Sequence, residues 1–136
     1  MKNFKLKTLL QLLVLGSMYS LVNIIPFIQY VWYDPFQQLL GASNTQLGLL
    51  ISVYGLGVIF LTPFGGFLCD KFDNKKLYII YLLMYAIGTF AFTMFPVYPV
   101  ALVVWGVYVA GAALMQYPTH LKMVRLLATE ENQGKI

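Results

Sequence analysis

The sequence predicts an all-α membrane protein with four transmembrane helices, and three observations support this prediction. Hydrophobic residues make up 60% of the 136 positions and charged residues only 10%, whereas soluble domains carry about 25% charged residues. The uncharged stretches are long, since residues 8–33, 35–69 and 77–119 contain no Asp, Glu, Lys or Arg. The Lys and Arg residues lie only in the segments that flank or separate these stretches.

Each uncharged stretch predicts its helices by length, because about 20 apolar residues cross the hydrocarbon core. The first predicts a span at 8–33, and the second a span at 47–69 with its surplus outside the bilayer. The third is too long for one crossing and predicts spans at 77–95 and 99–119, joined by a turn around Pro96. Buried strands are excluded because they run about four to eight residues. Lipid also requires every backbone amide to be paired within its segment, which favours helices.

The positive charges predict the orientation of these spans. If the spans alternate in direction, all nine Lys and Arg residues fall on one side of the membrane, at Lys2, Lys5, Lys7, Lys71, Lys75, Lys76, Lys122, Arg125 and Lys135. The opposite loops, 34–46 and 96–98, contain none. The positive-inside rule then places both termini of this segment in the cytoplasm, with the protein in the cell membrane. The net charge of +4 reflects this asymmetry, so the expected partner is the lipid bilayer and not a nucleic acid.

The loop between the second and third spans carries a specific pattern. Residues 65–76 read Gly-Gly-Phe-Leu-Cys-Asp-Lys-Phe-Asp-Asn-Lys-Lys. This resembles the signature loop of the major facilitator superfamily, Gly-x-x-x-Asp-(Arg/Lys)-x-Gly-x-(Arg/Lys)-(Arg/Lys), which that family also places between helices two and three on the cytoplasmic side. The matching positions are Gly66, Asp70, Lys71, Lys75 and Lys76. Asp73 departs from the pattern, because the family usually has glycine there.

The residue types in this loop suit the inner end of a helix. Gly65 and Gly66 let another helix approach closely in lipid, and Asp70 can cap a neighbouring helix or pair with a cation. The resemblance implies that the loop is a conformational latch that holds the two halves of the transporter in the outward-facing state. It also implies that the partner of Asp70 lies on a helix beyond this chain. The alternative is an ordinary positively charged inner loop after a pair of glycines.

Polar and aromatic residues at helical spacing are candidates for a substrate cavity. The resemblance implies that helices one and four line the central cavity of the N-terminal half. The candidates on these helices are Tyr19, Asn23, Tyr30, Trp105, Tyr108 and Gln116. Such groups face either a partner helix or a cavity in hydrocarbon, so hydrogen bonding between helices and an aromatic belt at the interface are the alternative. Asp34 is expected at the outer surface, and His120 at the inner interface.

The resemblance implies transmembrane solute transport by alternating access. Because the family fold has twelve helices in two halves, this chain is expected to be a fragment of the N-terminal six-helix half. Its expected partners are a small-molecule substrate and the remaining helices of the transporter. Residues 122–135 resemble a loop of sugar or organic-anion permeases, whereas Val107 stands where proton-linked exporters carry an arginine. The alternative is a complete four-helix protein, either a homodimeric transporter or a non-transporting membrane subunit.

No residue pattern indicates an enzyme. Cys69 and His120 are the only residues of their kinds, which excludes an intrachain disulfide and a His/Cys metal spacing. The sequence also lacks a Ser-His-Asp set and a phosphate-binding loop. We therefore expect no catalytic residues, no metal and no cofactor.

Overall fold

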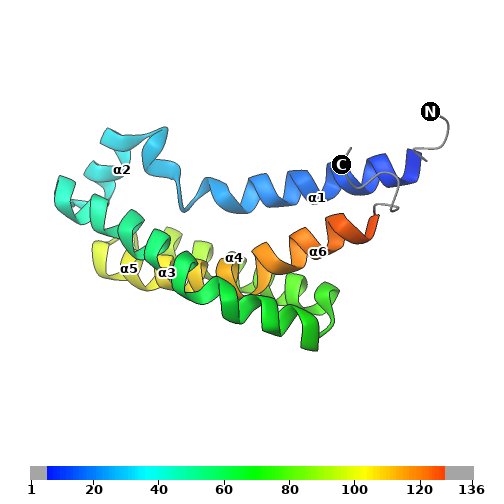
Figure 1. The fold of residues 1–136 in the computed structure, drawn as a ribbon. Coiled ribbons are helices and arrows are strands. Elements are labelled where there is room, and N and C mark those ends of the chain that lie inside the picture. Colours follow the sequence, from blue (N-terminus) through cyan, green and yellow to red (C-terminus); the bar gives the residue numbers. More distant parts are fainter. Residues whose placement is uncertain (1–5, 128–136) are drawn as a thin grey trace.

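The computed structural model describes residues 6–127, and the regular structure in that range is entirely helical (Figure 1). The elements are α1 (Leu6–Ile24), the 3-10 turn η1 (Ile28–Tyr30), α2 (Tyr33–Leu40), α3 (Asn44–Lys71), α4 (Asn74–Met94), α5 (Tyr98–Gly111), the π-helical turn η2 (Ala112–Gln116) and α6 (Tyr117–Leu127). The last three form one continuous rod. In the described range, four rods are therefore long and apolar enough to cross a membrane, which confirms the all-α membrane class.

The first helix is shorter than the sequence predicted. A span was expected to reach residue 33, but α1 ends at Ile24. Pro26 explains the difference, because a proline disfavours helical backbone in the residue before it. The other helices begin close to the predicted positions, and the fourth rod continues past residue 119 to Leu127. The predicted cytoplasmic charges at Lys2, Lys5 and Lys135 lie outside the described residues.

The segment expected to lie outside the bilayer contains a short helix, α2, which the charge pattern did not predict. It buries Phe36 and Leu40 against the core and ends at Gly41, whose left-handed backbone (φ 60°) suits glycine. The hydroxyl of Tyr33 donates to Asn44 Oδ1 at 2.8 Å and the amide of Gln37 donates to the same oxygen at 2.7 Å. These two bonds hold α2 against the start of α3.

Side-chain caps fix where α3 and α4 begin. At α3, the hydroxyl of Ser43 accepts from the backbone N–H of Gln46, and the side-chain oxygen of Gln46 accepts from the backbone N–H of Ser43. These two bonds form a capping box. At α4, Asp73 Oδ1 accepts from the backbone amides of Lys75 (2.9 Å) and Lys76 (3.4 Å). The position where the superfamily signature usually has glycine therefore starts a helix here through a side-chain cap.

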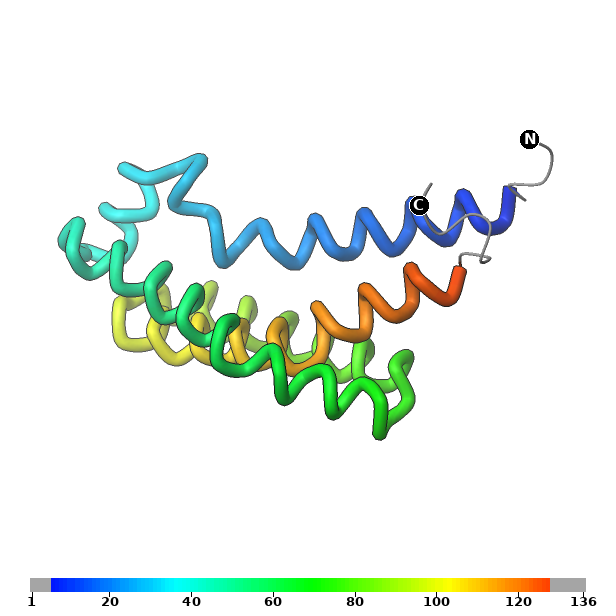
Figure 2. The backbone as a smooth tube through the Cα atoms, viewed as in Figure 1, coloured from blue at the N-terminus to red at the C-terminus, as the bar shows by residue number. Residues whose placement is uncertain are grey.

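The packed core lies along the fourth rod (α5, η2 and α6), which contacts α3 and α4. Its largest fully buried side chains include Trp105, Tyr81, Tyr108, Leu47 and Leu50. By contrast, Val22 is the only buried residue of α1. Figure 2 shows α1 running apart from the other rods and approaching α6 near the chain termini, where the two helices are in contact. Three rods thus form a compact unit, and α1 stands beside it.

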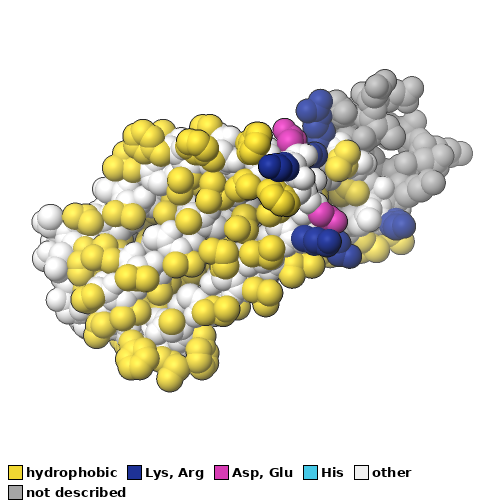
Figure 3. Space-filling view, turned by 90° about the horizontal axis from the view of Figure 1, so that it is seen from below, with side chains coloured by type: hydrophobic (Ala, Val, Ile, Leu, Met, Phe, Trp, Pro, Cys, Tyr) yellow, Lys and Arg dark blue, Asp and Glu magenta, His cyan; other side chains and the backbone are white. Residues whose placement is uncertain are grey.

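Apolar and charged side chains occupy different parts of the molecular surface. In the face drawn in Figure 3, hydrophobic side chains cover most of the length and the charged side chains gather toward one end. The exposed apolar residues include Ile59, Phe60 and Phe64 on α3 and Leu83, Ile87 and Phe90 on α4. A continuous apolar surface of this kind suits contact with lipid chains or with further transmembrane helices.

Gly65 is expected to be essential for packing, and Gly66 is not. A Cβ atom at Gly65 would overlap the Ala113 carbonyl oxygen and lie 2.9 Å from Leu114 Cα, whereas one at Gly66 would meet nothing within 4 Å. Gly65→Ala should therefore lower the free energy of unfolding by about 1–3 kcal/mol, and Gly66→Ala should leave it nearly unchanged. Thermal unfolding in detergent measures both, and equal effects of the two substitutions would contradict this packing.

Candidate functional site

An ion pair joins the signature loop to the fourth rod. Lys122 Nζ lies 3.0 Å from Asp70 Oδ1 and also donates to the Cys69 carbonyl oxygen at 3.1 Å. The ammonium group therefore sits at the C-terminal end of α3, where free carbonyl groups and the helix dipole both favour a cation. The family resemblance predicted a partner for Asp70 on a helix beyond this chain. In the structure its partner is Lys122, which is far away in sequence but adjacent in space.

The two members of this pair differ in exposure. The side chain of Lys122 is 35% exposed and that of Asp70 is 80% exposed, so the attraction between the charges contributes little stability, about 0–1 kcal/mol. The same end of α3 borders a cavity of about 300 Å³, whose lining includes Gly66, Pro118 and Arg125. The carboxylate of Asp70 remains open to further hydrogen bonds, since each of its oxygens can accept more than one.

The other signature residues lie around this ion pair at the same end of the molecule. Lys71 Nζ lies 5.8 Å from the centre of the Phe67 ring, which is within the range of a cation–π contact. The side chains of Lys75 and Lys76 are exposed. Gly66, Asp70 and these lysines thus form one charged edge where α3 ends and α4 begins. The structure brings together the five residues that the sequence pattern grouped.

Three of the six cavity candidates have their polar groups engaged within the fold. Trp105 Nε1 donates to the Pro26 carbonyl oxygen at 3.2 Å, and the Tyr108 hydroxyl lies 2.7 Å from the Thr89 hydroxyl. Both rings are buried in the core. The side-chain amide of Asn23 donates to the carbonyl oxygen of Tyr19, one turn earlier, at 2.7 Å.

The other three candidates occupy different surroundings. Tyr30 is 70% exposed beyond the end of α1. Tyr19 borders a cavity of about 500 Å³, where its ring centre lies 4.8 Å from that of His120 and 5.9 Å from that of Tyr117. Gln116, on the fourth rod, is fully buried. The sequence analysis did not single out Tyr117, although it lies next to Gln116 and continues the polar stripe of the fourth span.

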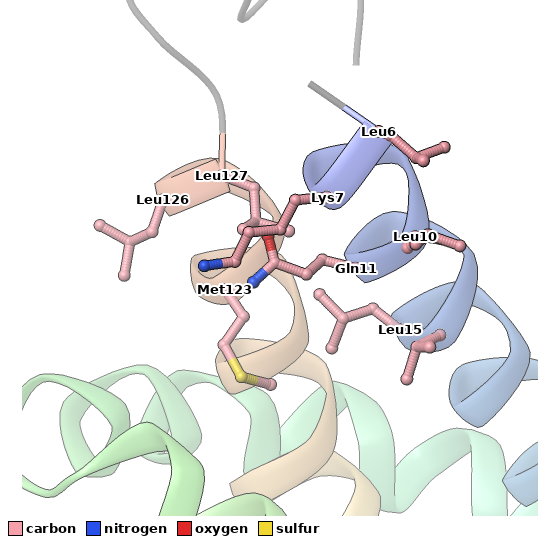
Figure 4. Close-up of a pocket in the computed structure, with 9 residues that line it drawn as sticks. Leu6, Lys7, Leu10, Gln11, Leu15, Met123, Leu126 and Leu127 are labelled. Carbon is pink, nitrogen blue, oxygen red and sulfur yellow. The ribbon is translucent and has the colours of Figure 1, made fainter. Parts of the chain in front are cut away.

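A second, larger groove separates α1 from α6, with a volume of about 760 Å³. Figure 4 shows its lining, in which leucines and Met123 form the walls while Lys7 and Gln11 project between the two helices. The walls are almost entirely apolar. This groove is therefore suited to hydrocarbon or to another helix, and the cavity at Tyr19 and His120 is the better suited to a polar solute.

Comparison with known proteins decides the family. A sequence profile of the Major Facilitator Superfamily matches residues 8–136. The chain belongs to the major facilitator superfamily. The matched residues include the signature loop, which joins α3 and α4 at the charged end of the bundle.

Two relatives within the superfamily illustrate how much of a transporter is present. The inner membrane protein YqcE of Escherichia coli K12 is 26% identical over 110 residues, which cover 81% of this chain and 26% of the relative. The quinolone resistance protein NorA of Staphylococcus aureus is 34% identical over 55 residues, which cover 40% of this chain and 14% of NorA. The matches thus span about a quarter or less of these relatives. No solved structure matches the chain.

The ion pair predicts unequal effects of its two members on stability. Lys122→Met removes both the contact with Asp70 and the hydrogen bond to the Cys69 carbonyl, whereas Asp70→Asn retains an oxygen that accepts from Lys122. Lys122→Met should therefore lower the free energy of unfolding by about 1 kcal/mol, and Asp70→Asn by less than about 0.5 kcal/mol. Lys76→Met is the matched control. The same loss in all three variants, measured by thermal unfolding in detergent, would refute this role for Lys122.

Proposed function

We propose that this chain is the N-terminal part of a secondary transporter that moves a small polar solute, such as a sugar or an organic anion, across the cell membrane by alternating access. The observation that carries the proposal is the superfamily match over residues 8–136, together with a signature loop that stands at the junction of two membrane-spanning helices. Transporters of this fold move one repeat against another around a central site. This chain contributes part of one of the moving units.

The proposed orientation places the signature loop and both termini of this segment in the cytoplasm. The described Lys and Arg residues, Lys7, Lys71, Lys75, Lys76, Lys122 and Arg125, belong to the chain ends and to the α3–α4 turn. Within residues 6–127, the segments between α1 and α3 and between α4 and α5 contain none. The positive-inside rule supports a cytoplasmic position for the charged end.

The proposed role of the signature loop is that of a conformational latch. Asp70 already ties α3 to α6 through Lys122, and most of its carboxylate surface is still open. A helix from the other half of the transporter could therefore present amide groups or a cation to Asp70 without displacing Lys122. Making and breaking that further contact would change the balance between inward- and outward-facing states, which differ by a few kcal/mol.

The proposed solute contacts lie along the faces of α1 and the fourth rod that meet at Tyr19. The cavity there is lined by the rings of Tyr19, Tyr117 and His120 and by two aliphatic side chains. Rings with polar tips can both pack against a solute and form hydrogen bonds with it. NorA's name refers to quinolone resistance, but the similarity covers 14% of that protein, and Val107 replaces the arginine of proton-linked exporters. We therefore retain a sugar or an organic anion as the solute class.

Transport by the whole protein tests this function. Proteoliposomes containing the complete transporter to which this chain belongs should take up a labelled sugar or organic anion saturably, and Asp70→Asn should slow that uptake severalfold. Lys2→Gln, which removes a charge outside the loop, should have little effect. The 136-residue chain alone should show no saturable uptake, because it lacks a second repeat.

Two results would contradict the proposal. Saturable uptake by the purified chain alone, especially as a dimer, would favour a small homodimeric transporter. Equal rates for Asp70→Asn and Lys2→Gln, at equal amounts of protein in the membrane, would show that Asp70 is only a solvated loop charge.

A further inference from the structure

Several buried polar atoms near the inner end of the bundle lack hydrogen-bond partners. Gln116 is 0% exposed, and neither its side-chain oxygen nor its nitrogen is bonded to any group within residues 6–127. The Tyr78 hydroxyl and His120 Nδ1 are likewise buried and unbonded in that range. A buried polar group without a partner costs about 1–3 kcal/mol, and the surrounding lipid offers no replacement. Within the described residues, these atoms therefore keep hydrogen-bonding capacity that the fold leaves unused.

The unbonded atoms belong to one cluster. Gln116 and His120 are four residues apart along the fourth rod and thus share a helix face. The Tyr78 ring centre lies 6.4 Å from that of His120, and its hydroxyl lies beside the Gln116 amide without meeting hydrogen-bond geometry. On its other side His120 contacts Tyr19 and borders the cavity of about 500 Å³. The imidazole therefore connects that cavity with the buried cluster.

The backbone at this position is also unusual. Gln116 is the last residue of η2, the π-helical turn that interrupts the fourth rod. Turns of this kind are rare and occur frequently at functional sites, since they change the register of the side chains that follow. The turn immediately precedes α6, which carries His120.

The charges around His120 leave room for one more positive charge. The ionisable groups that face it are Tyr19 from α1 and Tyr78 from α4. Tyr117 lines the same cavity, and its hydroxyl lies 3.3 Å from the hydroxyl of Tyr54 on α3. On its own helix, Lys122 carries a positive charge that Asp70 compensates. A protonated imidazole would therefore meet neutral neighbours and a neutral ion pair, without direct repulsion from an unpaired cation.

We propose that His120, Gln116 and Tyr78 form a proton-binding site within the inner half of the bundle. A carboxamide has both a donor and an acceptor group, and so does a phenol hydroxyl. The Gln116 side-chain oxygen and the Tyr78 hydroxyl can therefore accept from the N–H of a protonated imidazole, and such charge-assisted hydrogen bonds are stronger than those formed with the neutral ring. Histidine is the side chain whose charge changes near neutral pH. The proton enters from the cavity beside Tyr19 and binds at the imidazole nitrogen, which adds one positive charge to the site.

This site does not depend on the proposed transport function. In a working transporter a proton bound here would be the coupling ion, and its binding can be measured without any solute. A titration therefore tests the proton site separately, and loss of one proposal leaves the other intact.

Nuclear magnetic resonance of ¹⁵N-histidine in lipid nanodiscs tests the site. His120 is the only histidine in the sequence, so its two ring nitrogens give the only side-chain signals. These signals should titrate reversibly between about pH 4.5 and 8. Gln116→Leu and Tyr78→Phe each remove a group that can accept from the protonated ring. Each should lower the proton affinity by about threefold to tenfold, the equivalent of one hydrogen bond.

Tyr85→Phe is the matched control. Its hydroxyl is also buried and unbonded within residues 6–127, but its ring packs against Tyr108 at 4.8 Å, away from His120. This variant should titrate like the unmodified protein. A histidine that does not titrate above about pH 4.5, or one that titrates identically in all four proteins, overturns the proposal. If Gln116→Leu fails to fold, the more conservative Tyr78→Phe decides between these outcomes.

Discussion

Hydrocarbon provides no hydrogen-bond partners, and this constraint governs nearly every polar group in the described helices. Hydroxyl side chains within the spans donate to the carbonyl oxygen four residues earlier in the same helix, as in Ser20, Ser52, Thr62, Thr89, Thr93 and Thr119. Two aromatic side chains donate to carbonyl oxygens of other segments: the Trp105 indole N–H donates to the Pro26 carbonyl oxygen, and the Tyr98 hydroxyl donates to the Gln46 carbonyl oxygen. Most of these polar atoms thus bond to backbone carbonyl groups, whereas the Tyr85 hydroxyl and the atoms around Gln116 have no partner within the described residues.

The same constraint explains how α1 is attached. Because Pro26 ends regular helix, its carbonyl needs a donor, and the buried indole of Trp105 supplies it from α5. This bond and the packing of α2 fasten the C-terminal end of α1 to the core. The rest of α1 has contacts mainly with α6, so its surface is open to lipid or to further helices of the superfamily fold. A loosely attached first helix beside a packed unit is compatible with a cavity between α1 and the fourth rod.

The sequence predicted the membrane class, the order of the spans and the signature loop, because charged residues are costly in lipid and their spacing is visible directly. It could not predict the early end of α1 or the presence of α2, since Pro26, Phe36 and Leu40 add no charge to the pattern. The Asp70–Lys122 contact joins residues that are distant in sequence, so it could be recognised only in the folded structure. The pattern of polar and aromatic residues at helical spacing did not reveal that Trp105 packs in the core whereas Tyr19 borders a cavity, because both side chains are rings with a polar atom.

The orientation of the charged end is central to this account, because the latch, the ion pair and the proton site are all assigned to the cytoplasmic side. Reporter fusions measure it directly, using one reporter that is active only outside the cell and one that is fluorescent only inside. A fusion at residue 74, next to the Asp73 cap, should give the inside signal, and a fusion at residue 42, between α2 and α3, the outside signal. An outside signal at residue 74 would contradict the orientation and the cytoplasmic assignment of the signature loop.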